Sequence, residues 1–309
     1  MKISVCLLNY NSYPDTIECL ESLLGQTKKE FSIIVVDNLS TNDSIKRISS
    51  CLDKLNTDYS TYLHSDSAFS CTKAASSPNA NIFLISNSQN KGFSAGNNVA
   101  IHFSNKFLKN DQILLLNNDT IVQPDFIDTL SREYIFCKAK EKGKIAMGVT
   151  EYDFTSRKQN HCGFHYLHLP SGLAFQTPVI PCFKYICGAC LMFDKDAPLM
   201  DESYFLYFDD AEYTKILLKK GYTLCTTNKT HYFHKLSSSM TVPNFKIENQ
   251  FKSMWMFYRK HYPAFVLIVL FIRYFQYVFK RKFYISKIVY RTFKNQTLCL
   301  ILTSLMVVF

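Results

Sequence analysis

A cluster of polar side chains directly follows an apolar run near the middle of the chain. The run Leu114–Leu116 leads at once into Asn117, Asn118 and Asp119. Asn and Asp form turns readily, so a simple turn is one interpretation. The other is a ligand site at the end of a strand. The other strand ends of the same sheet decide between the two.

Three acids within four residues form a second cluster. Asp209, Asp210 and Glu212 follow the aromatic run 204–208. Acids at a helix start interact favourably with the helix dipole, but three exceed what that requires. A carboxylate beside aromatic side chains can have a raised pKa and act as a general base. This segment is therefore a candidate for acid–base chemistry.

His234 and a pair of cysteines are the remaining candidates. His234 alone is as well explained as a surface or core histidine, but together with Asp119 it offers a metal site. A carboxylate and an imidazole suit Mn²⁺, or Mg²⁺ completed by phosphate oxygens. Cys187 and Cys190 form a single CxxC without a second pair. A structural zinc site requires four ligands, so small packed residues at a strand start are the favoured interpretation.

The elements that must position these residues alternate along the first 120 residues. Continuous apolar strands between amphipathic helices predict an α/β fold whose parallel sheet is covered on both faces. Ligands in such sheets bind beyond the carboxyl ends of the strands. The predicted strands are Ile3–Leu8, Phe31–Val36, Ile82–Ile85 and Ile113–Leu116, and the predicted helices are Asp15–Leu24, Thr41–Leu55 and Ser94–Phe107.

Each of the four predicted strands is followed by polar residues. Asn9 and Asn11 follow the first strand, Asp37 the second, and the polar segment 86–98 the third. Asn117–Asp119 follows the fourth. Four polar strand ends at one edge of a sheet indicate a pocket rather than a set of turns.

Two regions interrupt or follow this pattern. Residues 56–81 are rich in Ser, Thr, Asn and Ala and are predicted to be a surface loop or a small excursion from the sheet, without chemistry. In the second half, residues 184–193 are predicted to form a strand, and a helix is predicted to end at Gly221. We therefore predict a domain over residues 1–245, which consists of two halves, 1–120 and 121–245, and is followed by a tail over residues 246–309.

Charge and cysteine usage limit the possible partners. The tail carries eleven Lys/Arg against one acid, Glu248, which accounts for the net charge of +10, while the preceding residues balance at 24 against 24. The domain 1–245 therefore gives no reason to expect a nucleic-acid partner. The chain begins MKISVCLLNYNS, without a cleavable signal peptide, and its eleven cysteines are scattered. We expect free thiols in a reducing cytoplasm.

Eight motifs in order resemble the inverting glycosyltransferases of family 2, which have the GT-A fold. The resemblance extends from residue 1 to about residue 240, interrupted at 56–81, and is strongest to the rhamnosyltransferase-like enzymes of bacterial surface polysaccharide assembly. The motifs are VCLLNYNS, CLESLLGQT, IIVVDNLSTNDS, NKGFSAGNN, LLLNNDT, YICGACLMF, DESYFLYFDDAEY and HKLSSS.

The resemblance implies a role for each matching position. It implies that Asp210 is the catalytic base, that Asp209 and Gly188 face the acceptor, and that Asp119 and His234 bind the divalent metal. Gly92 and Gly96 are expected to let the backbone approach the ligand. The positions implied to bind the nucleotide sugar are Asn9, Asn11, Asp37, Asn90, Lys91, Gly92, Asn97 and Asn118.

The sequence departs from the family pattern at two positions. Asn117 stands where the metal-binding DXD motif begins with Asp, which leaves Asp119 as its only carboxylate. Asp209 replaces the Glu of the usual Glu-Asp pair. The implied reaction is transfer of a sugar from a nucleoside diphosphate to a hydroxyl of a glycan or lipid-linked acceptor, in O-antigen or capsule assembly, with rhamnose as one candidate sugar.

Other functions are weighed against this one. A non-catalytic sugar-nucleotide-binding module would lack a base, which Asp210 argues against. The tail is expected to be helical: its apolar run Ala264–Ile272 is too short for a spanning helix of about 20 residues. The tail also contains a basic run, 280–282, and an apolar stretch, 297–309. It is a packed helical cap, or a basic segment at the inner face of the cytoplasmic membrane, where anionic lipids attract Lys and Arg. A short span by the stretch 297–309 is the third alternative. The apolar density of the tail fits these alternatives better than it fits a nucleic-acid partner.

Overall fold

The computed structural model describes residues 2–235 and 243–279. Its contacts group the chain into two compact units, each described here by itself. The first unit comprises Met1–His165, Lys184–Phe205 and Asp209–Ser239, and the second comprises Tyr166–Phe183, Leu206–Phe208 and Met240–Phe309. The second unit thus takes an internal segment that the sequence-based division at residue 245 assigned to the first domain.

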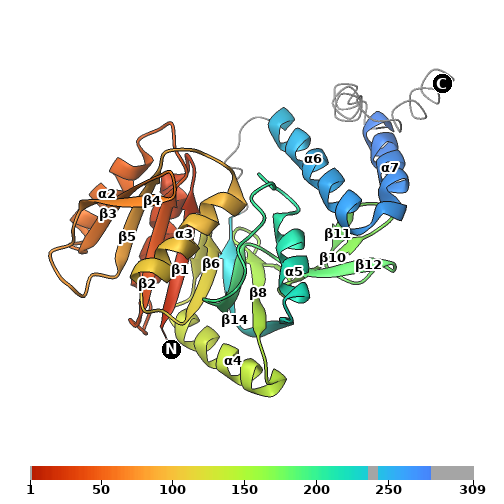
Figure 1. Cartoon of the computed structure of the whole chain (residues 1–309). Coiled ribbons are helices and arrows are strands. Elements are labelled where there is room, and N and C mark those ends of the chain that lie inside the picture. Colours follow the sequence, from red (N-terminus) through yellow and green to blue (C-terminus); the bar gives the residue numbers. More distant parts are fainter. Residues whose placement is uncertain (1, 236–242, 280–309) are drawn as a thin grey trace. The chain divides into compact units, whose positions relative to one another are not determined.

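The first unit is built on one 11-stranded sheet (Figure 1). Its strand order is β4-β3-β5-β2-β1-β6-β13-β8-β14-β7, and β9 pairs with β8. The parallel part comprises β1 (Ile3–Asn9), β2 (Phe31–Asp37), β3 (Tyr59–Ser65), β5 (Ile82–Asn87) and β6 (Gln112–Asn117). The other strands are β4 (Ala68–Lys73), β7 (Thr120–Val122), β8 (Ile145–Asp153), β9 (Gln159–His161), β13 (Cys190–Asp194) and β14 (Thr223–His234).

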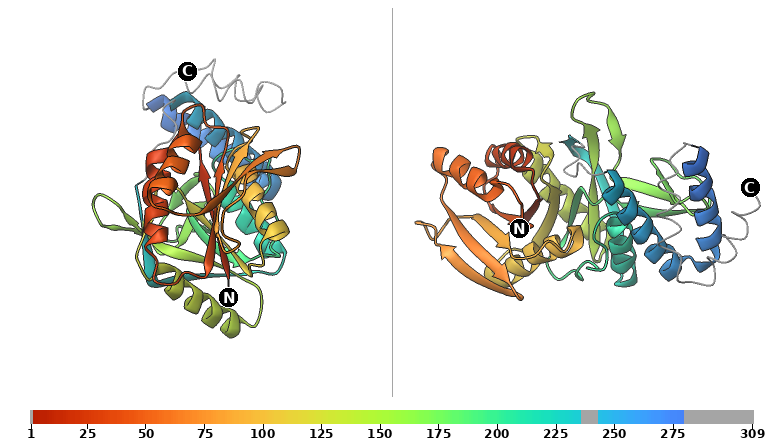
Figure 2. Two further views of the ribbon diagram at one scale, coloured as in Figure 1. Left: turned by 90° about the vertical axis from the view of Figure 1, so that its left-hand side faces the viewer. Right: turned by 90° about the horizontal axis from the view of Figure 1, so that it is seen from above.

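Helices cover both faces of this sheet (Figure 2). Alternate side chains of β2 explain why: Ile33 and Val35 enter one apolar core, while Ile34 and Val36 enter the other. A strand buried on both faces must be apolar at every position. The first core is closed by α1 (Tyr13–Leu24), α2 (Ser44–Lys54) and α4 (Phe126–Glu141), and the second by α3 (Phe93–Phe107) and α5 (Asp209–Lys219). The predicted α/β fold is confirmed.

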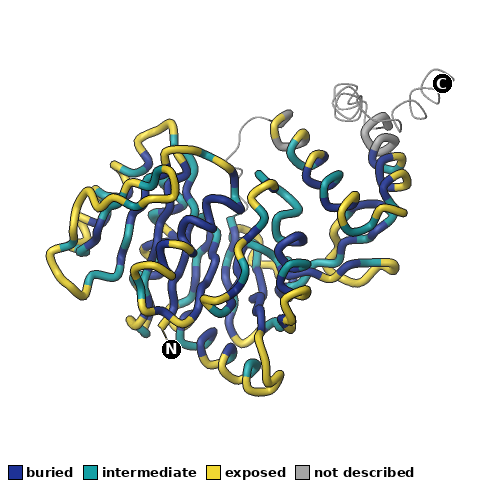
Figure 3. The backbone as a smooth tube through the Cα atoms, in the orientation of Figure 1, coloured by how far each residue is buried: buried dark blue, intermediate teal, exposed yellow. Residues whose placement is uncertain are grey.

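Residues 56–81 do not form the predicted surface loop. Strand β3 pairs in parallel with β5, and β4 pairs antiparallel with β3, so the segment extends the sheet by two strands. Most side chains of β4 are exposed (Figure 3). An edge strand with little burial needs few apolar residues, and for this reason its Ser- and Thr-rich sequence gave a weak strand signal.

The prediction of a single strand over 184–193 is also wrong, because the strand is interrupted at Cys187–Ala189. The residues before the break belong to β12 (Cys182–Ile186), in a three-stranded sheet of order β11-β10-β12. The residues after it form β13, which pairs antiparallel with β6. The other strands of the small sheet are β10 (Phe164–His168) and β11 (Leu173–Phe175).

The second unit packs two helices onto a turn. Met254 of α6 (Pro243–His261) and Val269 of α7 (Val266–Phe279) lie so close to Gly172 that an added Cβ would be 3.2 and 3.1 Å from their side chains. The helical expectation for the tail is therefore confirmed as far as residue 279. None of the helices in the described ranges is long and apolar enough to cross a membrane. The basic run 280–282 and the apolar stretch 297–309 lie outside the described residues.

Candidate active site

The polar ends of four parallel strands lie at one edge of the sheet. In the strand register, Asn9 is level with Asp37, Leu8 with Asn117, and Asp37 with Ser86. The sequence-based grouping of these strand ends is therefore confirmed by the pairing.

Asn9 and Asp37 form the centre of this edge. Asn9 is fully buried, and its amide donates to Asp37 Oδ1 at 2.6 Å while its Oδ1 accepts from the Thr16 hydroxyl at 2.8 Å. Asp37 also accepts from the backbone N–H and the hydroxyl of Ser40, at 3.0 and 2.5 Å. Both ends of the Asn9 side-chain amide thus bond to other side chains of the protein, and the Asn9 side chain holds Asp37 in place.

Asn11 shapes the loop after β2. Its backbone is left-handed, with φ of 56°, and its Oδ1 accepts from the backbone N–H of Thr41 at 2.8 Å. Asn tolerates this conformation better than most residues. The 37–41 loop is therefore held from both Asp37 and Asn11.

A second hydrogen-bond group joins β2 to the loop before α3. The Asn38 amide donates to Asn90 Oδ1 at 2.9 Å and to the Gly92 carbonyl at 3.1 Å, and Asn87 donates to Asn38 Oδ1 at 3.1 Å. Asn90 also accepts from the Gly92 N–H. Sequence analysis missed the linking roles of Asn38 and Asn87, because pairs of Asn residues far apart in sequence carry no spacing signal.

Two glycines, Gly92 in this loop and Gly96 in α3, pack closely against the protein. Gly92 has φ of 92°, and a Cβ there would overlap the backbone of Phe205. At Gly96 a Cβ would overlap the Leu8 side chain. Both glycines allow close packing at the start of α3, where Asn97 is buried and donates to the Phe93 carbonyl. Their expected approach to a ligand stays a prediction.

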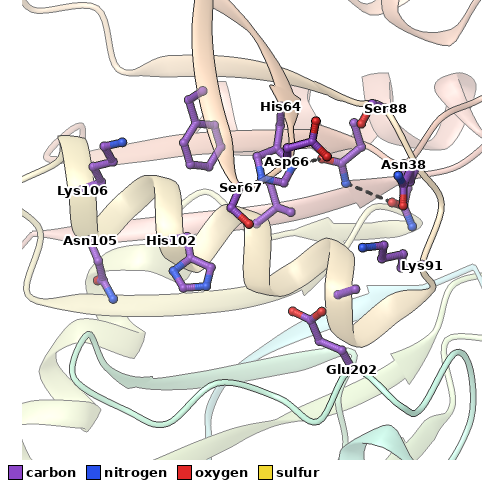
Figure 4. A pocket seen from close by; sticks show the side chains of 15 residues that line it. Asn38, His64, Asp66, Ser67, Ser88, Lys91, His102, Asn105, Lys106 and Glu202 are labelled. Atoms are coloured by element: carbon purple, nitrogen blue, oxygen red, sulfur yellow. Dashed lines mark hydrogen bonds between the residues drawn. The ribbon is translucent and has the colours of Figure 1, made fainter.

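A cavity of about 580 Å³ borders this loop (Figure 4). The hairpin of β3 and β4, to which the sequence assigned no chemistry, supplies His64 and Asp66 to one wall. The exposed Lys91 lies in the lining together with Asn38. The predicted nucleotide-sugar loop thus faces an opening of the first unit.

Asp119, His234 and Glu151 form one buried chain of interactions. His234 Nε2 lies 3.0 Å from Asp119 Oδ1, and His234 Nδ1 lies 2.8 Å from Glu151 Oε2. Tyr232 donates to the same Glu151 oxygen at 2.8 Å. Next to Asp119, Asn118 donates to the Thr16 hydroxyl at 2.8 Å. The predicted Asp119–His234 pair is thus brought together, while Glu151 was not foreseen.

The charges in this chain stabilise one another. Burial disfavours the charged imidazole, but the hydrogen bonds to Asp119 and Glu151 outweigh it and raise the pKa of His234 to about 10. Burial likewise opposes ionisation of Glu151, yet His161 and His234 hold its pKa well below the ordinary value. Without a metal, His234 is therefore a protonated ring between two carboxylates.

The Asp119–His234 pair fits a divalent metal ion. The donor set is one carboxylate oxygen and one imidazole nitrogen, and the 3.0 Å between them matches adjacent ligands of an octahedral ion bound at about 2.1 Å. Two protein ligands leave several positions for phosphate oxygens and water. A metal ion would replace the proton of His234 Nε2, and Glu151 would orient the ring from its other side.

Asp209 and Asp210 open helix α5, as the sequence predicted. Burial raises the pKa of the Asp210 carboxyl, although backbone N–H groups of Ala211 and Gly188 favour its charged form. Burial, followed by the charge of Asp210, raises the pKa of Asp209. An added Cβ at Gly188 would be 3.1 Å from the Asp210 Cβ, a tight contact that would press on the Asp210 side chain. A carboxylate with a raised pKa is suited to act as a base near neutral pH.

Three solved structures are similar to this chain in fold. The mannosyltransferase PcManGT from Pyrobaculum calidifontis, in complex with GDP-Man and Mn²⁺, has 14% sequence identity and a TM-score of 0.53, covering 99% of this chain and 79% of that one. S. aureus TarS 1-349, in complex with UDP-GlcNAc, has 14% identity and a TM-score of 0.51, covering 90% and 73%. GalNAc-T7, with UDP, GalNAc and Mn²⁺, has 12% identity and a TM-score of 0.56, covering 82% and 47%.

At these identities the similarity shows the fold, which is that of GT-A glycosyltransferases. The sequence match goes one step further: residues 4–135 match the model of glycosyl transferase family 2. A comparison with curated protein sequences gives no match. The family match over residues 4–135 and the shared fold are the starting point for the functional proposal below.

The buried acids predict a pH-dependent stability. A carboxyl whose folded-state pKa is raised binds its proton more tightly when folded, so its contribution to stability is present at low pH and lost as the pH rises through that pKa. Asp209→Asn removes this loss. We expect its free energy of unfolding at pH 8 to exceed that of the wild type by about 1.4 kcal/mol for each pKa unit of the shift. Its thermal midpoint should therefore be higher at pH 8, and the gain should shrink towards pH 5.

Thermal unfolding at several pH values measures this effect. Asp128→Asn, at a more exposed acid on α4 that pairs with Arg132, gives the reference for loss of one charge with little burial. An Asp209→Asn protein less stable than the wild type by the same amount at pH 5 and pH 8 would contradict the burial argument.

Proposed function

We propose that the protein is an inverting, metal-dependent glycosyltransferase that moves a sugar from a nucleoside diphosphate to an acceptor hydroxyl. The observation that carries this proposal is the environment of Asp210, a carboxylate of raised pKa at the start of α5 with glycine packed against it. The polar edge of the sheet, centred on Asp37, and the family match over residues 4–135 support the donor assignment.

The proposed mechanism is a direct displacement. Asp210 accepts the proton of the acceptor hydroxyl while its oxygen attacks the anomeric carbon. The bond to the nucleoside diphosphate breaks on the opposite face, and the leaving group departs with the electron pair. One base without a carboxylate nucleophile gives inversion. Asp209 and Gly188 flank the base on the side where we place the acceptor.

The donor would be held at the polar edge of the sheet. Asp37 and Asn11 would bind the base and ribose, and Asn90, Lys91, Gly92, Asn97 and Asn118 would face the rest of the donor. Asp119 and His234 would hold a Mn²⁺ or Mg²⁺ ion, whose chemistry is to offset the negative charge of the diphosphate. Lys91 would add a positive charge for the leaving group.

The sugar and the pathway are finer parts of the proposal. We infer a glycan or lipid-linked saccharide acceptor in surface polysaccharide assembly, with rhamnose among the candidate sugars, on the basis of the motif resemblance. Diphosphate release from a panel of sugar nucleotides, measured with the purified chain, identifies the donor. Release from none of them, with every acceptor offered, would favour a non-catalytic binding module.

The base assignment is tested by Asp210→Asn. We expect transfer to fall by at least about a hundredfold, as for loss of a general base, while calorimetry shows donor affinity close to that of the wild type. Asp209→Asn serves as the neighbouring control, with a smaller loss. Transfer by Asp210→Asn at the wild-type rate would remove this residue from the role.

The metal assignment is tested by Asp119→Ala. Loss of the only carboxylate of the motif should weaken Mn²⁺-dependent donor binding by at least about tenfold, which is about 1.4 kcal/mol. Asp125→Ala changes a nearby acid at the start of α4 and should leave Mn²⁺-dependent donor binding unchanged. Equal donor affinity of the wild type with and without Mn²⁺ would show that the metal assignment is wrong.

We also propose a peripheral location at the inner membrane surface, on the basic composition of the tail. Full-length protein should sediment with vesicles that contain anionic lipid and less with neutral ones. Replacement of Lys280, Arg281 and Lys282 by Gln should reduce this binding without loss of diphosphate release in solution. Equal sedimentation with both vesicle types would exclude an electrostatic contact.

A further inference from the structure

Three potential metal ligands gather in the first unit beside the residues discussed so far. One ligand atom from each of His161, His165 and Cys187 lies within 4.8 Å of the other two. They come from the end of β9, the start of β10 and the break after β12. Sequence spacing gave no sign of this group, because the cysteine follows the histidines by more than twenty residues.

Backbone contacts hold the group together. Cys187 N–H donates to the Gly163 carbonyl at 3.2 Å, and Gly163 N–H donates to His161 Nδ1 at 3.0 Å. Gly163 has φ of 87°, and a Cβ there would be 2.8 Å from the Thr226 side chain, so only glycine allows this turn. The turn sets the two imidazole rings 4.4 Å apart between centroids.

The remaining nitrogen of His161, Nε2, faces the Glu151 carboxylate. Its side chain is only 2% exposed, and Nε2 has no hydrogen-bond partner. Glu151 Oε2 is 3.3 Å from Nε2, an ion-pair distance, but without the alignment that a hydrogen bond requires. Nε2 therefore has an ion-pair contact with Glu151 but no hydrogen bond, and His161 belongs to a group with two further potential ligands.

We propose that the His161 and His165 imidazoles and Cys187 Sγ bind one Zn²⁺ ion. For His161 to bind through Nε2, its ring proton must move to Nδ1, and the hydrogen bond that Nδ1 accepts from Gly163 N–H is then lost. Imidazole and thiolate ligands suit zinc, whereas the oxygen-rich Asp119 site suits Mn²⁺ or Mg²⁺. The fourth position is left to water or to the Glu151 carboxylate. The thiol proton is released to solvent on binding, since the thiolate is the ligand. Cys190 takes no part, because it is buried in the apolar core.

The ion would position the acceptor side of the site. Cys187 directly precedes Gly188, which packs against Asp210. Zinc held between the 161–165 turn and Cys187 fixes the backbone behind the base. The site goes beyond the proposed transfer reaction, and its occupancy does not depend on that reaction.

The test is metal content. Purified full-length chain is incubated with zinc and dialysed, and zinc is measured by mass spectrometry. We expect about one equivalent in the wild type and background levels in Cys187→Ser and His165→Asn. Cobalt in place of zinc should give a thiolate charge-transfer band that Cys187→Ser removes. Zinc should also raise the thermal midpoint of the wild type by several degrees and leave that of Cys187→Ser unchanged.

Two controls separate this site from its surroundings. Cys162→Ser changes an exposed thiol next to His161 and should keep the zinc. Asp119→Ala should keep the zinc as well, whatever happens to donor binding. Circular dichroism monitors folding; if Cys187→Ser does not fold, His165→Asn and the wild-type cobalt spectrum decide. Loss of zinc from the wild type on dialysis, or retention in both ligand variants, would overturn the proposal.

Discussion

The contact on which the site most depends is the imidazole of His234 between the carboxylates of Asp119 and Glu151. These residues lie on three separate parts of the chain, and only the placement of β14 unites them. This strand runs antiparallel to β7, with His234 level with Thr120, and parallel to β8, with a bulge between Thr227 and His231. A shift by one residue would turn Phe233 towards the carboxylates instead. The pairing of β14 therefore creates the metal-binding corner.

The same corner is tied to the nucleotide edge by a chain of polar contacts. Asn118 donates to Thr16, Thr16 to Asn9, and Asn9 to Asp37. Lys235, directly after His234, pairs with Asp15 and Glu18 of α1 at 3.1 and 2.8 Å. Helix α1 thus bridges β14 and the parallel strands. Fully paired buried networks are rigid, so a donor would meet side chains already oriented.

The sequence predicted the parts of this site that leave a local signal. Strands β1, β2, β5 and β6 are apolar at nearly every position because both faces are buried, and their polar ends mark one edge. Glu151 could not be found in this way, because its partners Asp119, His161 and His234 are not its neighbours in sequence. The hairpin of β3 and β4 escaped notice since an exposed edge needs no apolar pattern. The break at Gly188 was hidden because small residues also occur within strands.

Stability and chemistry conflict most clearly at the start of α5. Asp209 and Asp210 are adjacent carboxylates whose burial raises their pKa, and ionised they would repel each other. The fold offsets part of this with backbone N–H groups of Ala211 and Gly188 at Asp210. A helix could begin with one acid at lower cost. A second, poorly solvated carboxylate is useful where a proton must be taken from a weakly acidic hydroxyl, because a base of raised pKa accepts it more readily. The presence of this destabilising pair of adjacent carboxylates is therefore itself an argument that they take part in chemistry.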